Sequence, residues 1–428
     1  MRSLLQRFTK SEFLKNVLTL VSATGIAQAI SLLIYPVLTR IYTPAEHGLF
    51  SLYMSIITIT AIISTGKYEL AVMIPKKEKD GAGLTLLSIL LSLAFSIVLL
   101  FFIAFFHRSI PGWFGNEHLA PWLFFIPIST FFVAVFQALT YWANRQKAYR
   151  TIAGANLGQS VINSAVKLSA SKAMLNGGGL MTGAIVGQVA GALIYAARLI
   201  RRGGEVFRSV RISDMAGLAK EHSFFPRFSM LHKLINNFSS SLPVFVFSLY
   251  FNAEIVGFFG LGFMLINRPM NLLSGSFTKV FSQKIIAMHN GGTPIYSEIT
   301  KFVLRMAALA SVPFLIVVFF APVLVTVIFG DNWFESGVYM RIFTPWLFMV
   351  FLSSPLMFVA DMVSRQRKAM LIEVIKFVLR IGALVVGVVL DDVRIALWLF
   401  SGVSFLVVSY SLVWYLQLSK RADIGKVQ

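Results

Sequence analysis

Cationic side chains interrupt the long apolar stretches of this 428-residue chain, and simple packing explains them poorly. A charge near mid-bilayer costs on the order of 3 kcal/mol by insertion scales, so it is retained where it faces a cavity or a partner. Arg268 and Arg380 lie deepest in their stretches, and Lys233 and Lys376 lie roughly 10 Å in, at a rise of about 1.5 Å per residue. Three further cations lie nearer to an end: Lys67, Lys167 and Arg227.

Carboxylates are scarce in the same stretches, where only Glu69, Asp361 and Glu373 occur. Glu373, Lys376 and Arg380 are spaced i, i+3 and i+7, which places them on one helix face, with Glu373 positioned to neutralise Lys376. The excess of cations predicts an anionic cargo, and the fork of an arginine suits phosphate especially well. The alternative is structural, with each cation bonded to backbone carbonyls or extended towards the membrane surface. The candidate anion-binding residues are Arg268, Arg380, Lys233, Lys376, Lys67 and Arg227.

The elements that carry these residues are predicted to be membrane-spanning helices. Hydrophobic residues make up 57% of the chain and charged residues only 13%. Repeated apolar runs of about twenty residues are the length that crosses a bilayer, so we expect an all-α integral membrane protein with about twelve spans. The predicted spans lie at about 16–38, 49–73, 81–106, 119–141, 151–171, 180–197, 226–250, 256–278, 302–329, 338–363, 369–390 and 395–418. The chain has no cysteine, and its six histidines lack ligand-like spacing, so we expect no metal and no cofactor.

The net charge of +20 would suggest nucleic acid in a soluble protein. Here the basic residues concentrate in the loops on one side of the predicted membrane, which is the positive-inside pattern and indicates cytoplasmic termini. We therefore expect no nucleic-acid partner. The opposite side holds few basic residues, namely Arg40, Arg108, Lys172, Arg341 and Arg394.

Short sequence matches recur in order along the chain and predict two related halves. The tetrapeptide at 121–124 (PWLF) recurs at 345–348, and the basic loop at 145–147 (RQK) is matched at 365–367 (RQR). The Ala-Glu pair at 45–46 recurs at 253–254. Duplication within an apolar chain is typical of two-lobed transporters. We expect lobe one at 1–200, with a short amphipathic segment at 1–15, a basic connector at 201–222 and lobe two at 223–428.

Three motifs make the chain resemble the multidrug/oligosaccharidyl-lipid/polysaccharide exporter superfamily, and within it the bacterial Wzx-type polysaccharide flippases. They are LTRIYTPAEHGLF at 38–50, GKYELA at 66–71 and YWANR at 141–145. The resemblance implies two six-helix bundles around a central cavity in the bacterial inner membrane. It implies that an undecaprenyl-diphosphate-linked oligosaccharide moves from the cytoplasmic to the periplasmic leaflet, with cavity cations on the diphosphate. Arg268 resembles the arginine that related lipid II flippases carry in the eighth span.

The same resemblance implies alternating access without bond breakage, so the protein is expected not to be an enzyme. Its expected partners are the lipid-linked oligosaccharide, membrane lipids and other polysaccharide assembly proteins. The alternatives for the surface polymer are capsule, O-antigen, exopolysaccharide and a teichoic-type polymer. No motif identifies the sugar.

Two other classes of function are weighed against this one. A drug or cation antiporter of the same superfamily needs carboxylates deep in a lobe, and none lies near mid-membrane in the first half. A membrane glycosyltransferase or polymerase needs paired carboxylates or a base in a sizeable outer loop. The outer loops are short, and their acids are scattered: Glu46, Glu117, Glu254, Asp331, Glu335, Asp391 and Asp392. A non-transporting scaffold would leave the buried cations unexplained.

Overall fold

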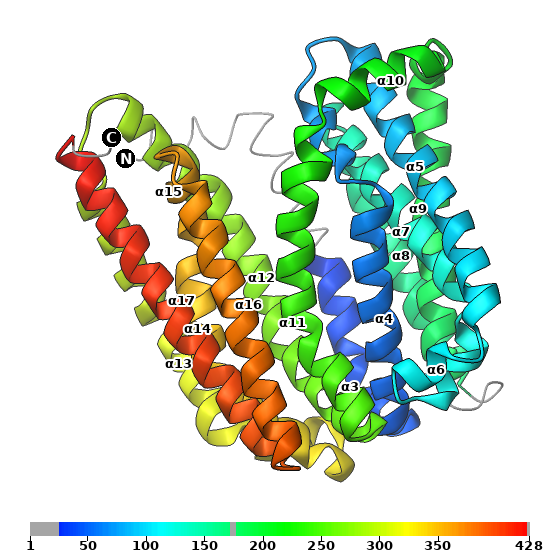
Figure 1. Ribbon diagram of the computed structural model, residues 1–428, viewed down its shortest axis with the longest axis vertical. Coiled ribbons are helices and arrows are strands. Elements are labelled where there is room, and N and C mark those ends of the chain that lie inside the picture. The colour runs from blue at the N-terminus through cyan, green and yellow to red at the C-terminus, as the bar shows by residue number, and fades with distance from the viewer. Residues whose placement is uncertain (1–24, 172–176, 426–428) are drawn as a thin grey trace. The chain divides into compact units, whose positions relative to one another are not determined.

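The computed structural model describes residues 25–171 and 177–425. The predicted amphipathic segment at 1–15, the start of the first predicted span and Lys172 lie outside these residues. The chain divides into two compact units, Met1–Ser241 and Leu242–Gln428. Within each unit, long helices pack side by side (Figure 1).

The first unit begins, in its described part, with the apolar helix Gly25–Ile41, whose end is α3 (Tyr35–Ile41). Its remaining elements follow in order: α4 (Pro44–Ser64), η1 (Tyr68–Met73), α5 (Glu78–Phe106), α6 (Ile110–Trp113), η2 (Glu117–Trp122), α7 (Phe125–Arg145), α8 (Tyr149–Ser169), α9 (Gly178–Arg208), α10 (Ile212–Glu221) and the π-helical turn η3 (Phe225–Ser229). Helix α11 (Met230–Tyr250) runs across the boundary between the units.

The second unit contains two very long helices at its start and a long helix at its end. Its elements are α12 (Ala253–Asn290), α13 (Tyr296–Phe329), η4 (Asp331–Trp333), α14 (Phe334–Ser353), η5 (Ser354–Leu356), α15 (Met357–Met362), α16 (Gln366–Val389) and α17 (Val393–Asp423).

Eight helices within the described residues are long and apolar enough to cross a membrane by length and composition. They are Pro44–Ser64, Glu78–Phe106, Phe125–Arg145, Gly178–Leu199, Ala253–Gly275, Tyr296–Phe329, Asp331–Met362 and Val393–Asp423. Helices α8, α11 and α16 coincide with further predicted spans but are more polar. These three helices carry Lys167 and three of the six candidate anion-binding residues, namely Lys233, Lys376 and Arg380. The predicted all-α membrane architecture is confirmed.

A stripe of glycines brings α8 and α9 close together in the first unit. Gly179, Gly183, Gly187 and Gly191 recur every fourth residue of α9, as in small-residue contacts between membrane helices. A Cβ atom on Gly187 would lie 2.7 Å from the Asn163 Cβ, and one on Gly183 would lie 2.4 Å from the Lys167 Cγ. These glycines therefore allow the polar face of α8 to pack against the α9 backbone.

Matching turns support the internal repeat. After α7 the Ala148 N–H donates to the Ala143 carbonyl at 2.8 Å, and after α15 the Arg365 N–H donates to the Ala360 carbonyl at 2.8 Å. In both turns the preceding residue, Lys147 or Ser364, is left-handed. The PWLF copies, however, do not occupy equivalent positions, because the first precedes α7 and the second lies inside α14.

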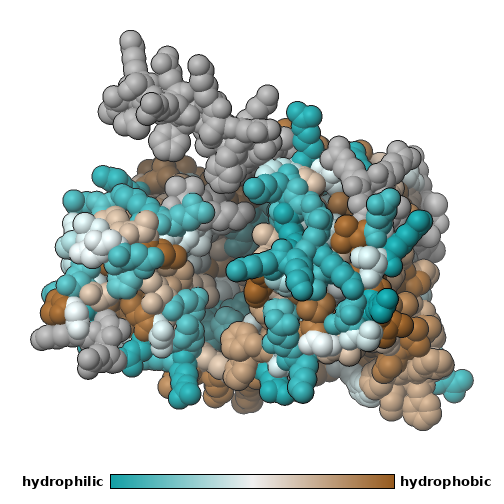
Figure 2. Space-filling view, turned by 90° about the horizontal axis from the view of Figure 1, so that it is seen from above, coloured by the Kyte–Doolittle hydropathy of each residue, from teal (hydrophilic) through white to brown (hydrophobic). Residues whose placement is uncertain are grey.

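The predicted connector at 201–222 is helical, since α9 continues to Arg208 and α10 follows. Helix α10 packs against α5, with Lys79 Nζ 2.7 Å from Asp214 Oδ2 and the Tyr68 hydroxyl donating to the Ala219 carbonyl. Figure 2 looks onto the end of the molecule at which α10 lies, and hydrophilic residues are widespread on this face.

Candidate functional site

The site in the first unit is built on a break between α4 and η1. The sequence predicted one continuous span over 49–73, but α4 ends at Ser64 and Gly66 and Lys67 adopt left-handed conformations, with φ of 56° and 61°. A left-handed lysine costs on the order of 1–2 kcal/mol relative to ordinary backbone. The turn therefore needs compensation from the contacts that it creates.

The turn folds Lys67 back onto Glu69. Lys67 Nζ lies 2.9 Å from Glu69 Oε1 and 3.5 Å from Gln137 Oε1. Lys67 is 7% exposed and Glu69 is fully buried. Glu69 Oε2 accepts no hydrogen bond from the residues that the structure describes. Residues two apart do not face each other on a helix, so a helical reading of this span could not have revealed the pair.

Two further candidate cations lie just before and within the first turn of α11. Lys233 is exposed and close enough to Lys67 for the two ammonium groups to repel each other. Arg227 is exposed within the π-helical turn η3, which packs against η1, and its charge acts on Tyr68. The structure thus brings Lys67, Lys233 and Arg227 to one region of the first unit. By contrast, Lys167 is buried, with its ammonium 4.4 Å from the centre of the Phe50 ring.

In the second unit, α16 carries a buried ion pair. Lys376 Nζ lies 2.6 Å from Glu373 Oε2, and Lys376 is 8% exposed. The predicted i, i+3 pairing of Glu373 with Lys376 is confirmed. Arg380 follows one turn later, and its positive charge opposes that of Lys376.

Arg380 is enclosed between aromatic rings. Its guanidinium carbon lies 4.8 Å from the Trp346 ring centre and 4.7 Å from that of Phe400, and Nε donates to Ser404 Oγ at 2.8 Å. The side chain is only 2% exposed. The buried guanidinium thus has two cation–π contacts and a hydrogen bond to Ser404 that compensate for its loss of water. Trp346 belongs to the repeated tetrapeptide, but no sequence pattern predicts that it stacks on Arg380.

Arg268 occupies α12 directly before Pro269 and is half-buried. The neighbouring Asn267 Oδ1 accepts a hydrogen bond from Asn271 Nδ2 at 2.5 Å. Arg268 also interacts with neighbouring groups. In the second unit, Arg268 therefore retains more exposed surface than Lys376 or Arg380.

Within the described ranges, no group of three or more histidine, aspartate or glutamate side chains is arranged to hold a metal ion. The chemistry that these residues can offer is therefore that of fixed positive charges and hydrogen-bond donors. Such groups bind and release an anion without a covalent step.

The fold of this chain resembles those of solved membrane transporters. An inward-facing multidrug resistance MATE family transporter of the MOP superfamily aligns with 14% identity, covering 93% of this chain and 96% of its own, at a TM-score of 0.72. The lipid II flippase MurJ, in an inward closed conformation, aligns with 12% identity, covering 94% and 90%, at 0.68. A MOP superfamily transporter from Pyrococcus furiosus, described as having a binding pocket of reverse polarity, aligns with 13% identity, covering 95% and 96%, at 0.66.

The family model for "Polysaccharide biosynthesis protein" matches residues 37–337. The chain belongs to this family of polysaccharide biosynthesis proteins. No curated protein matches the sequence. The predicted link to polysaccharide biosynthesis is confirmed at the level of the family.

Proposed function

We propose that the protein moves a polyprenyl-diphosphate-linked oligosaccharide across the bacterial inner membrane, from the cytoplasmic to the periplasmic leaflet. The observation that carries this proposal is the surplus of cations over carboxylates within the spans of a polysaccharide-family chain. A diphosphate is the anionic part of such a cargo, and guanidinium and ammonium groups are its natural donors. Both termini are proposed to be cytoplasmic.

The six candidate residues differ in how readily a cargo could reach them. Lys233 and Arg227 are exposed and Arg268 is half-buried, so we assign them the first contact with the diphosphate. Lys67 and Lys376 already have carboxylate partners in Glu69 and Glu373, so they contribute positive potential or exchange partners when the cargo arrives. Arg380 is held by Trp346, Phe400 and Ser404 and contributes mainly through its charge.

Transport then requires only that the protein alternate between states open to each leaflet. The cations hold the diphosphate, the lipid tail stays in the bilayer, and the sugar crosses together with the diphosphate. The cargo can shift the equilibrium between these states only by its difference in affinity for them. No bond is made or broken, so the protein is proposed to be a carrier and not an enzyme.

The test replaces Arg268, Arg380 and Lys233 with Ala singly, and combines Arg268→Ala with each of the other two. Surface polymer, the lipid-linked precursor in the cytoplasmic leaflet and the amount of protein in the membrane are measured. Arg341→Ala is a matched control. Arg341 is an exposed arginine of α14 outside the candidate set, and its Nε donates to the Val318 carbonyl. Lost polymer with trapped precursor and normal protein level supports the proposal. Normal polymer in the Arg268→Ala/Lys233→Ala double variant would remove these residues from the site.

A second candidate function is export of a cationic compound by antiport. It is favoured by the fully buried Glu69 carboxylate, whose Oε2 atom has no donor among the described residues. Glu69→Gln should then abolish drug resistance conferred by the protein while leaving surface polymer intact. Lost polymer without any change in drug resistance would reject antiport.

A further inference from the structure

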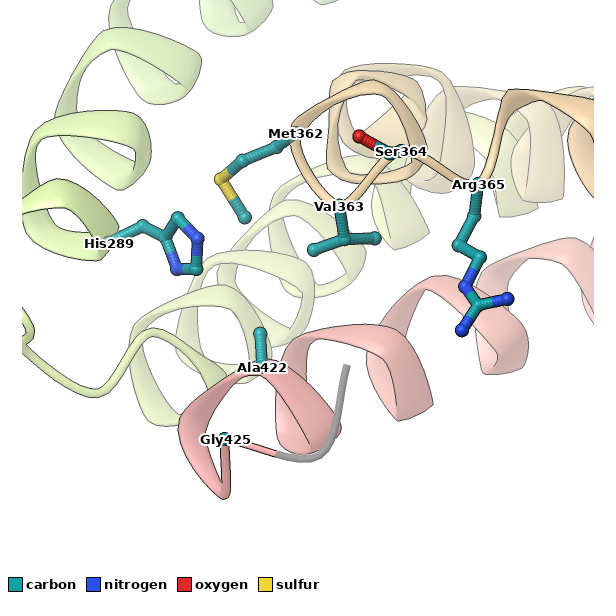
Figure 3. A pocket seen from close by; sticks show the side chains of 7 residues that line it. All are labelled: His289, Met362, Val363, Ser364, Arg365, Ala422 and Gly425. Atoms are coloured by element: carbon teal, nitrogen blue, oxygen red, sulfur yellow. The ribbon is translucent and has the colours of Figure 1, made fainter. Parts of the chain in front are cut away.

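A pocket of about 510 Å³ lies at one end of the second unit, separate from the cations inside the spans. Three segments form it: the end of α12, the turn between α15 and α16, and the end of α17 (Figure 3). All of its lining residues belong to the second unit, so its geometry does not depend on the first.

The backbone around the pocket is held on two sides. Ser364 is left-handed with φ of 55°, and the turn is closed by the Arg365 N–H donating to the Ala360 carbonyl at 2.8 Å. At the end of α17, the Asp423 carboxylate accepts from the N–H groups of Ile295 and Tyr296, at 2.7 and 2.9 Å. The start of α13 and the end of α17 are therefore tied together, which fixes one wall.

The residues that line the pocket include both hydrogen-bond donors and apolar side chains. Arg365 supplies a guanidinium, Ser364 a hydroxyl and His289 an imidazole, while Val363 and Ala422 lie between them (Figure 3). The Ser364 hydroxyl and the His289 ring have no side-chain hydrogen-bond partner among the residues that the structure describes. Guanidinium, hydroxyl and imidazole donors together suit the oxygens of a phosphate ester.

Two carboxylates at this end of the second unit are engaged by other groups of the protein. Asp423 is used by the α13 backbone, and Glu298 is bound to Lys284 at 2.5 Å. The first turn of α16 adds Arg367 and Lys368, which are exposed. Exposed basic side chains therefore lie beside the pocket.

The depth of the pocket corresponds to the head-group region. Lys368 Nζ lies 5.2 Å from the Trp414 ring centre and 5.7 Å from that of Tyr410. Lysines over tryptophan and tyrosine are typical of the boundary between hydrocarbon and head groups. Arg365 lies one helical turn before Lys368, so it is about 5 Å further towards water. We propose that this pocket binds a phosphate ester, carried by a lipid head group or by a soluble molecule, with Arg365 as its principal donor.

The test measures the melting temperature of the detergent-solubilised full chain with three probes. They are a short-chain phosphatidylglycerol, inorganic phosphate and a short-chain galactolipid that has acyl chains but no phosphate. We expect phosphate-bearing probes to raise the melting temperature and the galactolipid to have no comparable effect. Arg365→Gln should weaken apparent affinity about tenfold, the effect of losing one hydrogen bond to a charged group. Stabilisation by phosphatidylglycerol alone assigns the site to a lipid head group, and stabilisation by inorganic phosphate as well assigns it to soluble phosphate.

Two variants separate occupancy of the pocket from general charge. Val363→Phe fills the pocket without removing a charge and should abolish the response. Arg421→Gln removes an exposed charge near the same end of α17, outside the lining, and should leave the response intact. If Arg365→Gln does not fold, Ser364→Gly removes the hydroxyl while suiting the left-handed turn. An unchanged response in Arg365→Gln or Val363→Phe, or equal stabilisation by the galactolipid, overturns the proposal.

Discussion

Among the residues that the structure describes, each unit contains one buried lysine–glutamate pair, and the two pairs are built differently. In the first unit, Lys67 meets Glu69 across a left-handed turn between α4 and η1, and the carboxylate is fully buried. In the second, Lys376 meets Glu373 within the continuous helix α16, and the Glu373 side chain is 19% exposed. The first pair needs an unusual backbone, whereas the second follows from helix geometry alone.

Because the two pairs are built differently, loss of the glutamate has different consequences in each. Loss of Glu69 would leave a buried lysine without its counterion in a turn that already costs free energy. Loss of Glu373 would leave Lys376 beside a path to solvent. The Lys67 turn also packs against the π-helical start of α11, so the first pair is coupled to the position of Lys233 and Arg227. The second unit instead places its extra cation, Arg380, in an aromatic cage.

Glu69→Gln should destabilise the protein more than Glu373→Gln. Removing one partner of a buried ion pair costs roughly 3–5 kcal/mol, because the remaining charge is uncompensated. The cost for Glu373→Gln should be smaller, since its partly exposed side chain lets water replace it. Thermal unfolding in detergent, with the amount of protein in the membrane as a second readout, measures both. Equal losses for the two variants would contradict the distinction between a turn-dependent and a helix-dependent pair.

Arg380→Lys should lower stability, whereas Arg268→Lys should leave it nearly unchanged. Lysine cannot reproduce the planar stacking of Arg380 on Trp346 and Phe400 or its Nε bond to Ser404, a loss of about 2–3 kcal/mol. Arg268 is half-buried, so it is less enclosed than Arg380 and a lysine there loses fewer contacts. The melting temperatures of both variants are compared with their transport of precursor. Comparable destabilisation would show that Arg268 is as tightly enclosed as Arg380.

Hydropathy and charge predicted the fold because each span must carry an apolar surface of fixed length. The same signals could not predict how Lys67 is used, since its partner lies two residues away and is reachable only through a break within the predicted span. They also could not predict the cage around Arg380, because Trp346 and Phe400 come from α14 and α17 and their approach is tertiary. The i, i+3 spacing did predict the Glu373–Lys376 pair, because that contact is local.

Only some of the matching sequence motifs occupy equivalent positions in the two halves. The PWLF match predicts a duplication, but its copies lie before α7 and inside α14. The equivalent features are the turns ending at Ala148 and Arg365, whose hydrogen bonds match although their residues do not. The two turns thus share a backbone conformation although their amino-acid sequences differ. The glycines at every fourth residue of α9 are a sequence pattern that predicts close packing between helices.

Gly187→Ala should destabilise the first unit, while Gly382→Ala should be neutral or stabilising in the second. A Cβ at Gly187 would lie 2.7 Å from the Asn163 Cβ and 3.2 Å from its Cα, whereas nothing lies within 4 Å at Gly382. Overpacking costs about 1–3 kcal/mol, and relief of the helical glycine penalty gains up to about 1 kcal/mol. Unfolding temperatures in one detergent give the comparison. Equal tolerance at both positions would mean that α8 and α9 can separate at little cost.

The smallest difference in stability is expected between variants of two exposed ion pairs. These pairs are Lys79–Asp214 in the first unit and Arg394–Glu335 in the second. The hydrogen bond from Lys79, reinforced by the Arg211 N–H, holds the pKa of Asp214 below its ordinary value of 3.8. Its contribution is therefore present at neutral pH and is lost as the pH falls through the lowered pKa. Asp214→Asn should lower the melting temperature slightly at neutral pH, less so at high salt, and the gap to the unsubstituted protein should close in acid. Glu335→Gln provides the matched exposed pair. A gap that persists below the pKa of Asp214 would show that this residue anchors α10 through its hydrogen bonds and not through its charge.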